Sequence, residues 1–154
     1  MLKKNLILKK LKKKIKNNNL SIGTWMQISS SDIAEILSSD IYEWIVLDLE
    51  HGSFSLNELP NIFRAIELNE KVPFVRMKDS KCHDIGPILD SGAQGIIIPK
   101  VENKDDLEAI IKKTKYPPYG ERGVGFSRSN LFGKNFKKMI EEKQHPLIIP
   151  MIET

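Results

Sequence analysis

The sequence predicts an α/β fold in which helices cover a parallel sheet. Five short runs of β-branched and other apolar residues alternate with stretches of helical periodicity. The first four runs begin 23 to 29 residues apart, about the length of one strand, one helix and their loops. A chain of 154 residues, 40% of them hydrophobic, can bury one core. From the residues alone, both a barrel and a doubly wound sheet fit this pattern.

Each predicted element has a local signal. Four helices are predicted between the strands, over residues 32–39, 58–68, 83–92 and 104–113. Ser31 precedes the first helix, and a Ser55-to-Glu58 capping box marks the start of the second. Gly92 closes the third helix, and Asn103 precedes the fourth. The predicted strands are apolar runs bounded by turn or helix signals, and they cover residues 20–27, 43–50, 72–77, 95–100 and 146–153.

The first 19 residues predict a basic amphipathic helix that leads into a domain over 20–154. Leu8, Leu11 and Ile15 recur at helical spacing, with lysines between them. These 19 residues hold eight lysines and no acid, whereas the whole chain has a net charge of +4, so the domain itself is net acidic. Because the helix has no interleaved aromatic residues, we expect a solvated face and no nucleic-acid or membrane partner. Salt-sensitive binding that is lost on deleting residues 3–16 would indicate otherwise.

The expected compartment is the cytoplasm. No apolar run approaches the roughly 20 residues of a membrane span, and lysines interrupt any signal-peptide core near the amino terminus. The single Cys82 excludes an intramolecular disulfide and fits a reducing environment.

Ionisable residues follow several predicted strands at the point where each strand ends. Because the carboxyl ends of parallel strands meet at one edge, we expect these groups to form a site. Arginine suits a carboxylate or enolate, histidine moves protons near neutrality, and a carboxylate suits a hard divalent cation. The combination indicates metal-assisted enolate chemistry on a small carboxylate. The residues are Asp48, Glu50 and His51 after the second strand, Arg76 after the third, Lys100 after the fourth and Glu153 after the fifth.

Other common site motifs are absent from the sequence. It has no dinucleotide-binding glycine loop, no Walker phosphate loop and no Cys-x-x-Cys pair. The glycine-rich stretch GERGVG at 120–125 is a weak signal for an anion-binding loop, because it does not follow a predicted strand.

Six sequence blocks resemble one family in its own order. They resemble the class II pyruvate-dependent aldolases, that is, the 4-hydroxy-2-oxoheptanedioate aldolases, grouped with citrate lyase beta subunits in the phosphoenolpyruvate/pyruvate-binding barrel superfamily. The resemblance implies a (β/α)₈ barrel. The blocks are GTW at 23–25, DLEHG at 48–52, VPFVR at 72–76, LDSGAQGIIIP at 89–99, YPPYGERGVG at 116–125 and IET at 152–154.

The resemblance also implies a role for four residues. His51 would be the proton-transferring base, and Asp90 would orient it. Arg76 would bind the 2-oxo acid and stabilise the enolate. Glu153 would be the first protein ligand of Mg²⁺, Mn²⁺ or Co²⁺. The implied reaction is reversible cleavage of a 4-hydroxy-2-oxo acid to pyruvate and an aldehyde by a homo-oligomer.

Length limits what this chain can do. A (β/α)₈ barrel needs about 250 residues, and only five strands are predicted here. We therefore expect a partial barrel, either a truncated gene product or part of a longer sequence, with little or no aldolase activity from these residues alone. The second carboxylate ligand of the metal has no counterpart in the sequence.

Three points stay open. Lys100-Val101-Glu102 is closer to the citrate lyase beta subunits, so an acyl-CoA lyase remains an alternative to the aldolase, as does a non-catalytic domain that binds a small ligand or a partner. Asp48 and Glu50 either tune the site or bind neighbouring backbone and arginine groups. Trp25 is expected to fill the barrel interior, with stacking on a ligand as the second reading.

Overall fold

The computed structural model describes residues 3–81, 83–141 and 145–153, and its centre is one parallel sheet of five strands. The strands lie in chain order, each paired with the next along the sequence. A doubly wound sheet reverses its strand order at a switch point, whereas a barrel wall does not. The predicted α/β fold is confirmed, and of its two alternatives the structure is part of a barrel wall. The strands are β1 (Gly23–Met26), β2 (Trp44–Asp48), β3 (Val72–Arg76), β4 (Gly95–Ile98) and β5 (Leu147–Pro150).

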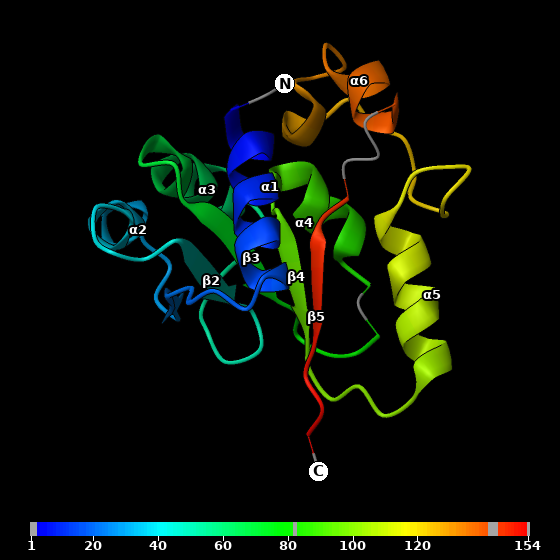
Figure 1. Ribbon diagram of the computed structural model, residues 1–154, viewed down its shortest axis with the longest axis horizontal. Helices are drawn as coiled ribbons and strands as arrows, with labels where there is room; N and C mark the ends of the chain where they lie inside the picture. Colours follow the sequence, from blue (N-terminus) through cyan, green and yellow to red (C-terminus); the bar gives the residue numbers. More distant parts are fainter. Residues whose placement is uncertain (1–2, 82, 142–144, 154) are drawn as a thin grey trace.

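Helices connect and cover the strands (Figure 1). The four predicted helices between strands are present, and so is the lead-in helix. The six-residue helix α6 and the 3₁₀ helix η1 were not predicted, because elements this short show too little periodicity. The helices are α1 (Lys3–Lys16), α2 (Ser31–Ser38), α3 (Leu59–Leu68), α4 (Ile85–Ser91), α5 (Lys104–Thr114), η1 (Arg128–Asn130) and α6 (Phe136–Glu141).

Helix caps agree only in part with the sequence signals. The predicted capping box before α3 is half made: Glu58 accepts a hydrogen bond from the Ser55 backbone N–H at 2.7 Å, but the helix begins at Leu59, with Glu58 as an N-cap that makes no side-chain capping bond. Asn103 caps α5, since its side chain accepts a hydrogen bond from the Asp106 backbone N–H at 2.9 Å. Gly92 ends α4 in the left-handed conformation with φ of 117°. The predicted cap of α2 was wrong by one residue, because Ser30 has the extended conformation and accepts the capping bond.

The two faces of the sheet bury different partners. Helices α2 to α5 pack on one face, against buried strand residues such as Leu47, Val75 and Ile96. The opposite face, called the inner face below, packs against α1 through Leu8 and Leu11. In Figure 1 the blue helix α1 lies over the sheet, with α2 and α3 to one side of the view and α5 to the other. The lead-in helix is therefore part of the core.

No helix among the described residues is long and apolar enough to cross a membrane. Cys82 lies outside the described residues.

Candidate active site

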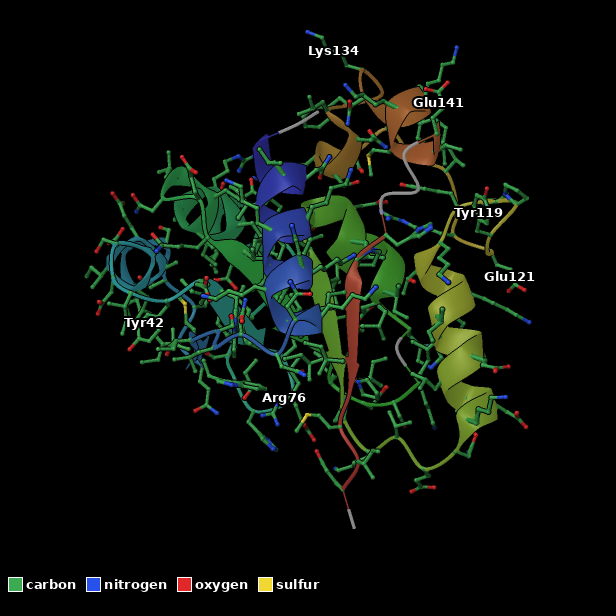
Figure 2. The ribbon with its side chains drawn as sticks, viewed as in Figure 1. Tyr42, Arg76, Tyr119, Glu121, Lys134 and Glu141 are labelled. Carbon is green, nitrogen blue, oxygen red and sulfur yellow. The ribbon has the colours of Figure 1, made fainter. Side chains whose placement is uncertain are left out.

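The predicted site residues begin at the ends of β2 and β3. Asp48 and Arg76 occupy paired register positions, so both side chains project from the inner face of the sheet. Figure 2 shows Arg76 toward the end of the molecule where β5 finishes, whereas Lys134 and Glu141 lie toward the other end. The edge formed by the carboxyl ends of the strands is called the rim below.

Asp48 is a fully satisfied carboxylate with a side chain only 1% exposed. Its Oδ1 accepts hydrogen bonds from Arg76 Nε at 2.8 Å and from the backbone N–H groups of Glu50 and His51, both at 3.1 Å. Its Oδ2 accepts from Arg76 Nη2 at 2.5 Å and from Gln27 Nε2 at 3.0 Å. Asp48 therefore binds backbone and arginine, the second of the two readings that the sequence left open.

These contacts set the charge states of the pair. Burial alone would raise the pKa of Asp48, but the hydrogen bonds from Arg76, Gln27 and the His51 backbone and the charge of Arg76 outweigh it, so the pKa is about 2. The hydrogen bond to Asp48 raises the pKa of Arg76, and the charges of Asp48, Glu50 and Glu153 add to the rise. Both groups are charged across the physiological range.

Glu50 connects the cationic groups of the rim. Its Oε2 lies 3.2 Å from Arg76 Nη1, and its Oε1 lies 3.4 Å from Lys100 Nζ and 4.0 Å from His51 Nε2. The Glu50 side chain is 10% exposed, whereas those of His51 and Lys100 are 64% and 66% exposed. The structure thus brings His51 and Arg76 together through Glu50, as the strand-end argument predicted.

A glycine makes the turn after β2 possible. A Cβ atom on Gly52 would lie 2.2 Å from the backbone oxygen of Asp48. The Gly52 N–H donates to that same oxygen at 2.9 Å, which closes the turn that carries Glu50 and His51. Only a residue without a side chain fits this approach.

Trp25 packs beside the arginine. The Arg76 guanidinium lies over the Trp25 ring, 5.0 Å from its centroid, which is a cation–π distance. Trp25 also borders an open apolar hollow of about 360 Å³ on the inner face. It thus faces the barrel interior as expected, although it is 43% exposed in this chain. The hollow is lined by Ile15, Ser21, Trp25, Trp44, Phe74, Ile97, Ile149 and Met151.

Glu153 lies beyond the end of β5 and is exposed. It follows the carboxyl end of β5, which lies on the same rim, and its charge helps to raise the pKa of Arg76. Among the described residues no three His, Cys, Asp or Glu side chains are grouped to hold a metal ion. Enzyme Mg²⁺ sites often use one or two carboxylates and complete their shell with water and substrate oxygens. Glu153 fits the role of one such ligand, but this part of the chain does not form a complete metal site.

Comparison with known proteins decides the family. Residues 21–154 match the HpcH/HpaI aldolase/citrate lyase family. The chain belongs to this family.

Its relatives carry several carbon–carbon bond activities in their names. The chain is 34% identical to a 2-keto-3-deoxy-L-rhamnonate aldolase of Escherichia coli over 75% of its length and 43% of that protein's. It is 33% identical to a 4-hydroxy-2-oxovalerate aldolase of Novosphingobium aromaticivorans, over 91% of this chain and 54% of the relative. The chain thus spans about half the length of the curated relatives it matches.

Solved structures agree on the fold. The HpcH/HpaI aldolase of Desulfitobacterium hafniense superposes with a TM-score of 0.80 at 25% identity, over 93% of this chain and 56% of that one. The citrate synthase SbnG superposes with a TM-score of 0.77 at 30% identity, over 93% and 55%. Five strands in barrel order are therefore part of the barrel that this family shares.

Asp90 lies away from His51 within this chain. It belongs to the last turn of α4, which runs back from the rim to the start of β4. The four residues of β4 span about 13 Å, so Asp90 and His51 lie at opposite ends of the sheet. Asp90 Oδ1 instead accepts a hydrogen bond from Arg122 Nη2 at 2.6 Å. The predicted orientation of His51 by Asp90 is thus not made within this chain.

The same ion pair explains the glycine-rich stretch. The Arg122 side chain is 6% exposed and its guanidinium lies over the Tyr116 ring, 4.5 Å from the centroid. Arg122 therefore fastens the segment after α5 to α4, which gives this residue of the stretch at 120–125 a structural contact.

Gln27 is the site residue that the sequence reasoning missed. It directly follows β1 and donates to Asp48, at the same rim as the predicted residues. Its position at a strand end was the available signal, but an uncharged amide did not attract notice among the ionisable groups.

Proposed function

We propose that this chain carries the oxo-acid-binding rim of a carbon–carbon lyase that reversibly cleaves a 4-hydroxy-2-oxo acid to pyruvate and an aldehyde. The observation that carries the proposal is the fixed orientation of Arg76. Asp48 holds its Nε and Nη2, and Trp25 supports its plane. The aldolase names of the relatives support the same reaction class.

Arg76 retains donors for a ligand. A guanidinium has five N–H groups, and two of them are hydrogen-bonded to Asp48. The others, on Nη1 and Nη2, make no hydrogen bond to the described residues, although Glu50 lies 3.2 Å from Nη1. They can bind the carboxylate and keto oxygen of an oxo acid. Because negative charge develops on that oxygen as the carbon–carbon bond breaks, these donors stabilise the enolate more than the substrate.

His51 is the proton carrier in this proposal. Its backbone N–H is held by Asp48, while its imidazole is 64% exposed and so open to a ligand or a water molecule. It would take the proton from the 4-hydroxyl group during cleavage and deliver it to C3 of the pyruvate enolate, and it would move the proton in the reverse direction during condensation. A backbone that is fixed beside Arg76 keeps this imidazole at the reacting end of the rim.

A divalent metal completes the proposed chemistry. Glu153 would bind Mg²⁺, Mn²⁺ or Co²⁺, and the bound cation would polarise the keto oxygen of the oxo acid. The carboxylates of Asp48, Glu50 and Glu153 outnumber the cationic groups of Arg76 and Lys100, which favours a cation when an anionic substrate binds.

Pyruvate binding tests the proposal on the 154-residue chain. Isothermal titration with Mg²⁺ should show binding that Arg76→Lys weakens at least about tenfold, since lysine cannot reproduce the planar fork. Lysine keeps a charge beside Asp48, and circular dichroism would verify that the variant is folded. Absence of binding, or equal binding by the variant, would contradict the proposal.

His51→Gln separates proton transfer from binding. The variant should bind pyruvate as the wild type does, but exchange of the pyruvate methyl protons into D₂O, followed by NMR, should fall by about 10²–10⁴-fold. Unchanged exchange would remove His51 from the mechanism. Cleavage of a 4-hydroxy-2-oxo acid by this chain alone should be slight or undetectable, and robust metal-dependent release of pyruvate would refute that expectation.

A further inference from the structure

Lys100 lies in a bulge at the end of β4. Backbone pairing continues past the strand, because the Met151 N–H donates to the Ile98 oxygen at 2.8 Å and the Val101 N–H donates to the Met151 oxygen at 3.0 Å. Pro99 and Lys100 therefore stand opposite a single residue of the neighbouring segment. Bulges of this kind redirect a side chain and occur often beside active sites.

The backbone of Lys100 is in an unfavourable conformation. Its φ is 51°, in the left-handed region, which is strained for a residue that carries a side chain. In a regular strand Lys100 would project on the same face as Ile98, toward the helices. The bulge instead directs it to the inner face, where its Nζ lies 3.4 Å from Glu50. A strained residue that carries a charge to the rim points to a role at the site.

The contact with Glu50 leaves Lys100 available. Its side chain is 66% exposed and its ion pair with Glu50 is long, so this contact contributes little to stability. Arg76, by contrast, is 11% exposed and held by Asp48. Glu50 touches both cations through its two oxygens, so the ammonium and the guanidinium lie on either side of one carboxylate. A ligand with two anionic groups can engage both.

We infer that Lys100 binds a second anionic group of the substrate, and that the chain therefore prefers 2-oxo acids that carry a further carboxylate or phosphonate. This inference rests on the proposed function, in which Arg76 holds the 2-oxo carboxylate. Lys100 then determines which 2-oxo acids the site binds most tightly. It leaves Glu50 for the second anion, while Arg76 keeps Glu50 in place.

Four probes separate charge from size: pyruvate, 2-oxobutyrate, oxaloacetate and phosphonopyruvate. 2-Oxobutyrate adds an uncharged carbon to pyruvate, whereas the last two add an anionic group at the same carbon. Titration of the 154-residue chain with Mg²⁺ should show oxaloacetate or phosphonopyruvate binding about tenfold more tightly than 2-oxobutyrate. The two anionic probes also distinguish a carboxylate from a phosphonate.

Variants test whether Lys100 causes the preference for the anionic probes. Lys100→Met should bring the anionic probes within about twofold of 2-oxobutyrate without weakening pyruvate, and Lys100→Arg should retain the preference. Lys104→Met is the matched control, because Lys104 is 84% exposed on α5, where it pairs with Glu108. It should behave as the wild type.

The outcomes distinguish the two hypotheses. Similar binding of all four probes by the wild type, or a preference that survives in Lys100→Met, overturns the inference about Lys100 and leaves the proposed function standing. Failure of every probe to bind contradicts the proposed function itself.

Discussion

Asp48 and Arg76 stand at paired positions on neighbouring strands, and two hydrogen bonds join their side chains where both strands end. The Asp48 side chain is 1% exposed and that of Arg76 is 11% exposed. In such a buried pair each charge depends on the other, because an unpaired charge at this depth would have lost its hydration without compensation. The pair orients the guanidinium, and it also ties β2 to β3.

Removal of one member should cost more stability than removal of both. Asp48→Ala should lower the free energy of unfolding by about 3–5 kcal/mol, because it leaves Arg76 uncompensated. Addition of Arg76→Met to that variant should recover part of the loss. Urea denaturation of the single and double variants measures the coupling. Strictly additive losses would show that the pair is not coupled.

Stability should fall in acid as Asp48 takes up a proton. Its pKa in the folded protein is about 2, below the ordinary value of 3.8, so the unfolded chain binds more protons between these values. The contribution of Asp48, about 2 kcal/mol, is present above pH 4 and is lost as the pH falls toward 2. Urea denaturation of the wild type and Asp48→Asn from pH 5 to 2 tests this. The difference between them should shrink with falling pH, and a constant difference would contradict the assignment.

Gly52→Ala should disrupt the turn that carries His51. The added Cβ would lie 2.2 Å from the Asp48 oxygen, so the backbone must move, at a cost of about 1–3 kcal/mol. Gly86→Ala is the matched control, because nothing lies within 4 Å of a Cβ there. Pro87 follows Gly86 in helix α4 and opposes the gain that alanine usually brings to a helix, so stability should stay close to that of the wild type. Thermal denaturation compares them. Equal stability of Gly52→Ala and wild type would show that the turn tolerates a side chain.

Asp90→Asn tests the reassignment of this carboxylate. Arg122, with a side chain 6% exposed, would lose its charged partner, so stability should fall by about 1–3 kcal/mol. Pyruvate binding should remain unchanged, since Asp90 lies at the other end of the sheet from Arg76. Unchanged stability with slower methyl-proton exchange would restore the catalytic role that the family resemblance implied.

Strand ends were a sound guide to the rim, whereas the role of Asp90, on a helix, stays a prediction. Arg76 and Asp48 directly follow apolar runs, and parallel pairing carries both to one edge, so their proximity followed from fold class. Asp90 was assigned by resemblance alone. A helix that returns antiparallel to its strand carries its last turn away from that edge, which argues against a contact with His51 in one chain.

The sequence did not show which side chains form ion pairs or hydrogen bonds with one another. Glu50 was left undecided because its neighbours, Arg76 and Lys100, lie 26 and 50 residues further along the chain. Gln27 was overlooked because its side chain is an uncharged amide, and its partner Asp48 is likewise distant in the sequence. Glu50 and Gln27 meet their partners only because the folded chain packs distant segments side by side.

The amino-acid sequence by itself determined the α/β class, the five strands and the edge at which the ionisable groups gather. Hydrophobic periodicity and strand direction are local properties, and they suffice for these conclusions. Tertiary structure alone decided which carboxylate each cation contacts, that Asp90 pairs with Arg122, and that Lys100 turns toward the inner face. Those outcomes rest on burial, on contacts between distant segments and on one left-handed backbone conformation, none of which a residue pattern specifies.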